Sequence, residues 1–308
     1  MKFLFLVIVV SLGITLEGCN KKIEKINVSS QSDISLELSK FNEIESSHDQ
    51  NKKKEYFNRV LKLAESDDSS AQNLMGVIFE NGYLSQSEDL EKAIYWYKKA
   101  IENNNGVAEN NMGSLYASGR GVEKNYKRAY EYYKNAMNKN VPEAINSIGF
   151  MYLNGFYFDR DLKEACKYFK KSADMGHYVG AANTANCYHE GWNGSPDKAK
   201  YFKYSLQAAE ENYAPSQFNV AVMYDKGEII EKSIPKAMYW YHKALEQEDS
   251  RAAYNLAFLY EEGDGVEKNL FTAYRYYELA YDMGLEMALI KVKELEPSIN
   301  KLKEDLKN

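Results

Sequence analysis

Small, apolar and polar positions between residues 71 and 296 recur with a period of 36 residues. Each unit opens on a small residue, carries an aromatic residue at its ninth position and has a glycine three residues later. The opening position recurs at intervals of 37, 36, 36, 36, 36 and 36 residues, at Ala71, Ala108, Ala144, Gly180, Ser216, Ala252 and Ala288. Such a period is typical of stacked structural units rather than of one globular core. The pattern predicts six repeats over 71–287 and a partial seventh from residue 288.

Two further columns of residues mark the ends of helices. The first column holds side chains that accept hydrogen bonds from the free N–H groups of a first helical turn. It comprises Asp89, Asn125, Asp161, Asp197, Ser233 and Asn269. Fifteen residues further on stand mostly glycine and asparagine, which tolerate the left-handed conformation that ends a helix: Asn104, Asn140, Gly176, Asn212, Glu248 and Gly284. Each unit therefore contains a first helix, helix A, that ends before the loop glycine, and a second, helix B, between the two columns.

Small residues occupy the positions where these helices must approach each other. They are Gly76, Gly113, Gly149, Ala185, Ala221 and Ala257 in helix A, and Ala93, Ala129, Ala165, Ala237 and Ala273 in helix B. Tyr201 interrupts the second column, so we expect the fourth repeat to pack with a local adjustment or to turn a ring outward. Helix B also carries paired aromatic residues, such as Trp96 and Tyr97. Because these pairs recur in every unit but the fourth, we interpret them as packing rather than as a platform for a cofactor or carbohydrate.

One such helix pair cannot bury its apolar faces alone, so the units must stack. The sequence predicts an all-α fold, an α-solenoid of antiparallel helix pairs over residues 52–296. Residues 52–70 are predicted to form a half-repeat at the N-terminal end. At the other end Pro297 is expected to interrupt the helix that begins at Ala288, and residues 297–308 are expected to form a separate capping helix.

The repeat resembles the Sel-one-like repeat family, relatives of the tetratricopeptide repeats. The likeness rests on Ala252-Ala-Tyr-Asn-Leu-Ala-Phe-Leu-Tyr-Glu-Glu-Gly263 followed by Ala273-Tyr-Arg-Tyr-Tyr-Glu-Leu-Ala280, and it extends over about residues 71–296. This resemblance implies a right-handed superhelix and a scaffold or adaptor role, with partners bound on a concave face lined by helix A.

The first residues are typical of an export signal. Lys2 precedes an apolar run from Phe3 to Leu16 that is too short to span a bilayer. The run closes on Leu16-Glu17-Gly18-Cys19, which resembles a bacterial lipoprotein box in all but Glu17. We expect residues 1–18 to be removed and Cys19 to be lipidated; the alternative is an ordinary signal peptide that is cut nearby. The likeness, with Asn20 after the cysteine, implies the periplasmic face of the outer membrane. Residues 20–51 are polar without a sustained period and are predicted to form a flexible tether.

Composition and charge exclude several function classes. The net charge is −6 with no basic stripe, which argues against nucleic acid as a partner.

Two Ser-x-x-Lys matches, Ser195 to Lys198 and Ser233 to Lys236, precede a helix B, where serine and proline serve capping. The Lys-Thr-Gly and Ser-Asp-Asn motifs that accompany Ser-x-x-Lys in β-lactamases are absent, so we expect no catalytic site.

Histidine and cysteine positions indicate no metal site and no cofactor. His48, His177, His189 and His242 show no ligand spacing with the cysteines. Cys166 and Cys187 lie equally far before and after the turn near Gly176, which places them at one height in an antiparallel pair. Both a disulfide between them and two buried free thiols fit this placement.

A protein partner is the expected ligand. In tetratricopeptide relatives, asparagines on the concave face bind peptide backbone, which directs attention to Asn111, Asn183, Asn219 and Asn255; the competing interpretation is that each bonds a neighbouring repeat. Residues outside the repeat consensus are further candidates: His189, Glu190, Asp225, Lys226, Glu261 and Glu262.

The sequence favours a non-enzymatic interaction scaffold of the bacterial envelope that touches the membrane only through its lipid. One alternative is an immunity protein that neutralises a toxic periplasmic effector, for example a secreted lipase, since family members resemble that role. A β-lactamase-like hydrolase is the other alternative.

Overall fold

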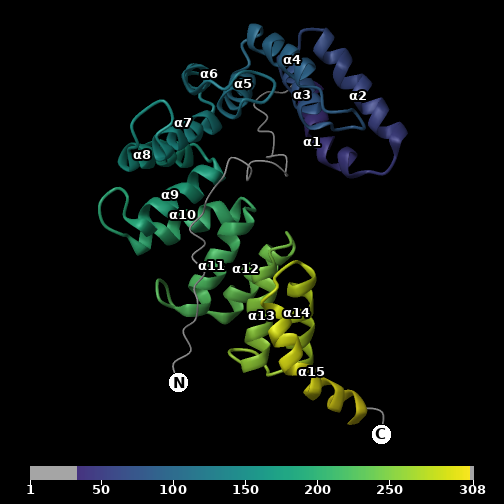
Figure 1. Cartoon of the computed structure of the whole chain (residues 1–308), viewed down its shortest axis with the longest axis vertical. Helices are drawn as coiled ribbons and strands as arrows, with labels where there is room; N and C mark the ends of the chain where they lie inside the picture. The colour runs from purple at the N-terminus through teal and green to yellow at the C-terminus, as the bar shows by residue number, and fades with distance from the viewer. Residues whose placement is uncertain (1–32, 306–308) are drawn as a thin grey trace. The chain divides into compact units, whose positions relative to one another are not determined.

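A computed structural model describes residues 33–305 of the chain, and this part is all-α, with fifteen helices and no strand. The chain divides into two compact units, Met1–Val141 and Pro142–Asn308. Figure 1 shows successive helices lying side by side as antiparallel neighbours within each unit. The prediction of an all-α solenoid of helix pairs is confirmed.

The first unit contains a helical cap and two complete repeats. Its helices are α1 (Asp33–Ser46), α2 (Gln50–Glu65), α3 (Ser69–Asn81), α4 (Leu90–Glu102), α5 (Gly106–Ser118) and α6 (Tyr126–Asn138). Helix α2 stands where the half-repeat was predicted, and its buried residues Tyr56, Val60 and Ala64 lie on one face. The pairs α3 with α4 and α5 with α6 form repeats 1 and 2.

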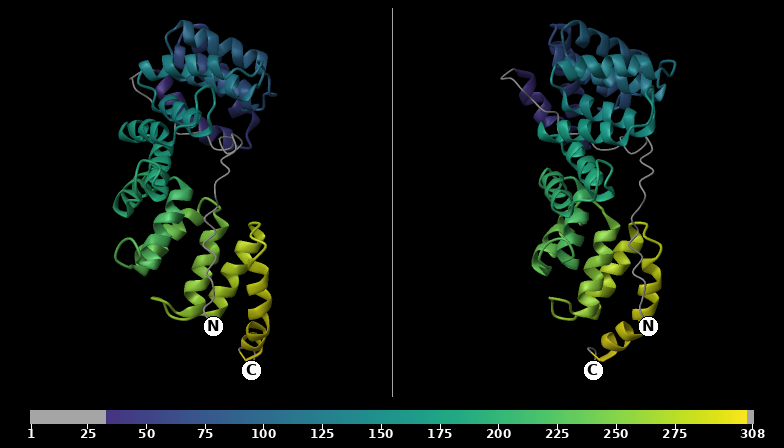
Figure 2. Two further views of the ribbon diagram at one scale, coloured as in Figure 1. Left: turned by 60° about the vertical axis from the view of Figure 1, so that its left-hand side comes forward. Right: turned by 90° about the vertical axis from the view of Figure 1, so that its left-hand side faces the viewer.

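The second unit contains repeats 3 to 6 and a terminal helix. Its helices are α7 (Pro142–Asn154), α8 (Leu162–Asp174), α9 (Tyr178–Glu190), α10 (Lys198–Glu210), α11 (Ala214–Lys226), α12 (Ile234–Leu245), α13 (Ser250–Glu262), α14 (Leu270–Asp282) and α15 (Ala288–Asp305). Figure 2 shows the same order of helix pairs from two further sides.

Helix ends follow the predicted cap chemistry. All six residues of the first column stand at N-caps, and in five of them the side chain accepts a hydrogen bond from a backbone N–H of the first turn; Ser233 makes no such bond. The six residues of the second column have positive φ angles between 59° and 91°, and this set includes Glu248 at 64°. The loop glycines also have positive φ, for example 68° at Gly82. Local chemistry thus ends each helix where the sequence predicts.

The small residues of helix A allow the aromatic rings of helix B to pack against its backbone. A Cβ atom placed on Gly113 would lie 2.6 Å from Cε1 of Tyr133, and one on Gly149 would lie 2.7 Å from the ring of Phe169. In repeat 4 the ring of Tyr201 lies over His189 at a centroid distance of 4.7 Å. Tyr204 supplies the buried ring of that repeat and stacks on Tyr188 at 5.7 Å. This is the contact that Tyr132 makes with Tyr116 in repeat 2, and the position of the second ring, Tyr133 there, is the buried Ser205 in repeat 4.

The tether prediction for residues 20–51 is wrong from Asp33 onward, where α1 and the start of α2 are helical. Phe41 is 1% exposed and packs against Tyr56 and Tyr83, at centroid distances of 6.0 and 5.7 Å. A carboxylate oxygen of Glu45 accepts a 2.7 Å hydrogen bond from the backbone N–H of Leu84. Phe41, Ile44 and Glu45 thus tie the end of α1 to the first repeat. The rest of the predicted tether lies outside the described residues.

The predicted break at Pro297 is also wrong, because α15 continues through this proline. Leu295 and Ile299 are buried on either side of it, against Ala257 and Tyr277. Proline removes one backbone hydrogen bond from a helix and bends it, and packing of both flanking residues holds the helix together across that loss. Figure 1 shows the last turns of α15 leaving at an angle.

Candidate functional site

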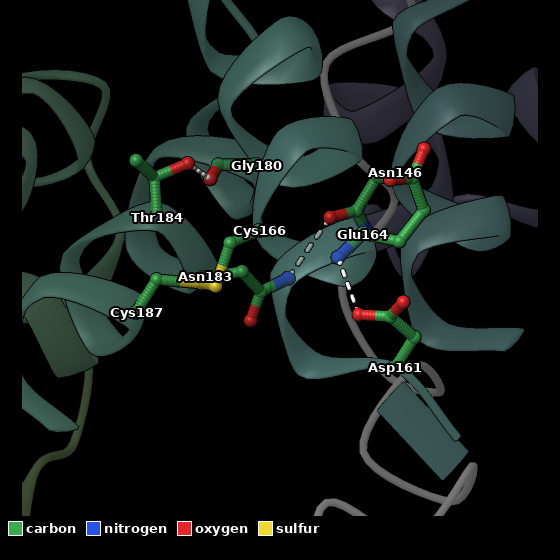
Figure 3. The surroundings of a disulfide bond; sticks show 8 residues. All are labelled: Asn146, Asp161, Glu164, Cys166, Gly180, Asn183, Thr184 and Cys187. Atoms are coloured by element: carbon green, nitrogen blue, oxygen red, sulfur yellow. Dashed lines mark hydrogen bonds between the residues drawn. A yellow bond between two sulfur atoms is a disulfide. The ribbon is translucent and has the colours of Figure 1, made fainter. Parts of the chain in front are cut away.

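Two of the predicted binding asparagines are engaged by a neighbouring repeat. The side-chain amide of Asn111 donates a 3.0 Å hydrogen bond to Oδ1 of Asn73, and that of Asn183 donates a 2.9 Å bond to Oδ1 of Asn146. Figure 3 shows the second pair beside the disulfide. Asn146 and Asn183 are both buried. These side chains connect successive helices A, so Asn111 and Asn183 act within the fold, as the competing interpretation holds.

Of the other two asparagines, Asn255 in α13 also bonds a neighbouring repeat, through Tyr241 of α12, whereas Asn219 does not. Nδ2 of Asn255 donates a 3.0 Å hydrogen bond to the hydroxyl oxygen of Tyr241. Asn219 is half-buried, and its side chain makes no hydrogen bond to any residue from 33 to 305. Of the four, Asn219 alone keeps its amide available to a partner in the described part of the chain.

Buried tyrosines of helix B engage the predicted acidic residues. The hydroxyl of Tyr241 donates to Asp225 at 3.2 Å, and that of Tyr277 donates to Glu261 at 2.6 Å. Burial, followed by the hydrogen bond to Glu261, raises the pKa of Tyr277 far above its ordinary value. Lys291 also lies 3.1 Å from Glu261. Asp225 and Glu261 therefore hold helices together, since unpaired carboxylates would be costly in these positions.

Lys226 and Glu262 are both exposed beside these carboxylates, and Lys226 lies 3.3 Å from Asp225. The exposed residues extend the candidate surface along the ends of α11 and α13. His189 and Glu190 have the same position at the C-terminal end of α9.

His189 and Glu190 form an exposed pair at the C-terminal end of α9. Their side chains are 42% and 44% exposed, and Nδ1 of His189 lies 2.8 Å from Oε1 of Glu190. The ring of Tyr201 supports the histidine from helix B. This pair presents polar surface and is held in place before any partner arrives.

A disulfide joins Cys166 of α8 to Cys187 of α9, with a Cα–Cα distance of 5.9 Å (Figure 3). Both residues are buried, beside Phe169 and Trp192. The bond crosses from helix B of repeat 3 to helix A of repeat 4. It therefore lies in the interface between repeats rather than at a reactive surface.

The serine motifs lie at helix starts. Ser195 is exposed in the loop before α10, and Ser233 is the N-cap of α12. Nζ of Lys236 lies 5.1 Å from the ring centroid of Tyr224, where it makes a cation–π contact. Neither serine makes a side-chain capping bond, since Asp197 caps α10 and Ser233 only holds the N-cap position of α12.

Residues 33–305 hold neither a cluster of metal ligands nor a helix that could span a membrane. Within that range no three His, Cys, Asp or Glu side chains gather in a way that could hold a metal ion. Over the same residues no helix is both long and apolar enough to cross a membrane. Cys19 lies outside the described residues.

Sequence reasoning assigned no role to His177, which caps α9. Its Nδ1 accepts a 3.2 Å hydrogen bond from the backbone N–H of Gly180 and lies 2.9 Å from Oγ of Ser172. The hydroxyl of Ser172 lies 2.7 Å from the carbonyl oxygen of Pro142. Burial lowers the pKa of His177 to about 4, so the ring is neutral at pH 7. The sequence did contain a signal for this role. His177 follows Gly176 directly, and the equivalent position in two other repeats holds a capping residue, Asn105 or Asp249.

The Sel1 repeat model matches six segments of the chain, residues 69–105, 106–140, 142–177, 179–213, 214–249 and 250–285. These segments coincide with the six helix pairs of the structure. No curated protein matches the sequence.

Solved structures share the fold. A Sel1 repeat protein from Oxalobacter formigenes is 24% identical over 81% of this chain and 99% of its own, with a TM-score of 0.68. A protective antigen of uropathogenic Escherichia coli with an SLR fold is 27% identical over 84% of this chain, with a TM-score of 0.61. The match covers 55% of the antigen, so this chain spans about half of its length. With six consecutive matches that cover more than half of its residues, the chain belongs to the Sel1 repeat family.

Proposed function

We propose that this protein is a non-enzymatic scaffold of the bacterial envelope, held at the periplasmic face of the outer membrane by a lipid on Cys19. Tandem Sel1 repeats support a protein-interaction role in general. The specific site, the partner and the anchor are our proposal.

One observation carries the proposal: most of the candidate asparagines and buried carboxylates are occupied in holding helices together. Asn183, Asp225 and Glu261 all bond to other helices. What remains outside is a series of rigid helix ends with exposed polar side chains, among them His189 and Glu190. A preformed surface binds a partner at a smaller entropic cost than a mobile one. We therefore place the partner along the ends of α9, α11 and α13.

Affinity capture from the native envelope tests the scaffold. We expect the full-length protein to co-purify with one or a few envelope proteins, and His189→Ala/Glu190→Ala to lose them. A matched control is Lys170→Ala/Asp174→Ala, an exposed ion pair at the C-terminal end of α8, at the opposite end of the helix hairpin from the proposed surface. Equal recovery with all three proteins would reject this surface. Recovery of a secreted toxic effector as the main partner would identify the immunity role instead.

The anchor needs its own test. Metabolic labelling with a palmitate analogue should mark the wild-type protein and not Cys19→Ser, and the variant should leave the membrane fraction. An unlabelled wild-type protein would reject lipidation while leaving the interaction surface in place.

A further inference from the structure

Repeats 1 and 5 share an exposed tyrosine that the other four repeats lack. It is Tyr95 in α4 and Tyr239 in α12, 52% and 55% exposed. The equivalent positions of repeats 2, 3, 4 and 6 hold Glu131, Lys167, Lys203 and Arg275. Each tyrosine is followed by a tryptophan, with centroid distances of 5.2 and 5.0 Å and interplanar angles of 76° and 78°. The recurrent aromatic pairs of helix B are packing residues, but these tyrosines lie outside that column.

The same two repeats also share a polar network. In repeat 1 the amide of Gln72 donates to the carbonyl oxygen of Ala64 at 3.1 Å and to Oδ1 of Asp67 at 3.3 Å. In repeat 5 the amide of Gln217 donates to Ala209 at 3.2 Å and to Asn212 at 3.1 Å.

A third side chain completes each network. The carbonyl oxygen of the glutamine accepts from Asn103 in repeat 1, at 2.9 Å, and from Gln247 in repeat 5, at 2.8 Å. The glutamine occurs at this position in these two repeats alone. In repeat 2 the two positions instead form an ion pair, Glu109 with Lys139 at 3.1 Å.

In repeat 5 these side chains line a shallow pocket of about 240 Å³, with Asn212 and Gln217 beside Tyr239 and Trp240. Pockets for drug-sized ligands measure about 300–1,000 Å³, so this one suits a smaller group. Because the amides are bonded to one another, their remaining donors and acceptors point in fixed directions. The pocket combines two aromatic rings, set nearly perpendicular to each other, with a rim of amides.

Charge limits the ligand class. Lys243 lines the pocket but lies 2.8 Å from Glu246, and Glu210 contributes a carboxylate to the same rim. In repeat 1 the ammonium of Lys99 lies 5.8 Å from the ring centroid of Tyr95. Positive and negative groups balance, which favours neither a phosphate nor an acidic peptide. A purely apolar group would leave the amides without partners, at a cost in binding free energy.

We propose that repeats 1 and 5 each bind one sugar ring of a neutral glycan chain. The apolar face of a pyranose ring stacks on an aromatic side chain, and its hydroxyl groups donate to and accept from amides. A protein with two copies of the same site suits a polysaccharide, because that ligand is itself built of repeating sugar units. Simultaneous binding of both sites raises the overall affinity for a polymer by about 10²–10⁴ when the geometry allows it.

Titration with soluble oligosaccharides and retention on polysaccharides test the inference. The probes are cellotetraose, chitotetraose and mannotetraose in calorimetry, and cellulose, chitin and mannan as immobilised polymers. The variants are Tyr95→Lys, Tyr239→Lys and both together; lysine stands at this position in repeats 3 and 4, so the fold accepts it. Tyr281→Lys removes another exposed tyrosine, in repeat 6, and serves as the control.

We expect two sites for at least one tetrasaccharide, one site in each single variant, and none in the double variant. Retention on the matching polymer should weaken at least tenfold in each single variant and remain unchanged in Tyr281→Lys. Failure of all probes to bind, or equal binding by the double variant, overturns the inference. Loss of binding to neutral lipid vesicles or to a captured protein in the double variant, without glycan binding, would assign the twin sites to that ligand and also overturn it.

Discussion

Gly76 of α3 and Tyr97 of α4 meet so closely that a Cβ atom on the glycine would lie 2.4 Å from Cε1 of the ring. The hydroxyl of the same ring donates a 2.6 Å hydrogen bond to Glu80, which fixes the ring in place. The position of the Tyr97 ring thus requires a glycine at residue 76, and its hydroxyl is held by the carboxylate of Glu80. The contact couples the two helices of repeat 1 through shape and hydrogen bonding together.

Gly76→Ala should destabilise the first unit. Overpacking of a core costs about 1–3 kcal/mol, and the higher helix propensity of alanine returns up to about 1 kcal/mol. We expect a net loss of about 1–2 kcal/mol in the free energy of unfolding, measured by urea titration. Lys98→Ala in α4, at an exposed position, is the control. A variant as stable as the wild type would show that Tyr97 moves aside freely.

Removal of the disulfide should weaken the interface of repeats 3 and 4. Cys166 and Cys187 are 21 residues apart, and the chain-entropy relation for a loop of that length gives about 3 kcal/mol. We expect Cys166→Ala/Cys187→Ala to lose about this amount in urea titration. Dithiothreitol should shift the wild-type protein toward the double variant and leave the variant itself unchanged. A wild-type protein that does not respond to the reductant argues against the bond.

Acid should destabilise the second unit through His177. Burial lowers its pKa to about 4, whereas an unfolded histidine titrates near about 6.5. The folded state thus binds fewer protons, so this contribution is complete above about pH 6.5 and is lost as the pH falls toward 4. The loss amounts to about 3 kcal/mol. Urea titrations between pH 7.5 and 4.5 should show it in the wild type.

His177→Asn should remove that pH dependence, because asparagine caps α5 in the same way at Asn105. His189→Asn, at the exposed histidine, should retain it. If the curves of the wild type and His177→Asn fall in parallel as the pH drops, another group is responsible.

Arg120→Ala should loosen the contact between repeats 1 and 2. The guanidinium donates to Oε1 and to the backbone oxygen of Glu80, both at 3.0 Å, and to Glu88 at 3.2 Å. Burial already raises the pKa of Glu80, and removal of the cation raises it further. We expect a loss of about 2 kcal/mol at pH 7, typical of hydrogen bonds between charged groups.

Arg120→Lys is the matched control, since an ammonium cannot reproduce the planar set of three hydrogen bonds. It should recover less than half of the loss. Full recovery by lysine would mean that charge alone, without geometry, stabilises this contact.

Glu248→Gly should stabilise the protein. Glu248 has a φ of 64°, where the equivalent residues Gly176 and Gly284 have 88° and 91°. The left-handed conformation costs a residue with a Cβ atom about 1 kcal/mol, so glycine should raise the free energy of unfolding by about that amount. Glu246→Gly, two residues earlier at a φ of −55°, should lower it. A loss of stability in both variants would mean that the Glu248 side chain makes a contact that offsets the strain.

The repeat, its helices and their ends were predictable because each depends on chemistry within a few residues. An asparagine such as Asn125 caps a helix through its own side chain, and a glycine such as Gly119 ends one through its own φ angle. Six copies of the pattern make each assignment far stronger than one copy would. The two errors fell at the ends of the array, at α1 and at Pro297, where no neighbouring repeat supplies a pattern.

Binding residues were harder to predict because the sequence does not say which polar side chains are already engaged. Asn183 and His189 both belong to helix α9, yet one is buried against Asn146 and the other is exposed beside Glu190. Tyr95 and Tyr239 were visible in the sequence as departures from the repeat. Their significance depends on the networks of Gln72 and Gln217, which became apparent only in space.

By itself the sequence determined the period, the helix boundaries, the all-α class and the family, because these follow from local backbone chemistry repeated along the chain. The tertiary structure alone decided that Phe41 anchors α1, that Cys166 reaches Cys187, and which amides, carboxylates and rings remain exposed. Those outcomes depend on contacts between residues far apart in the chain, whose burial no local pattern specifies.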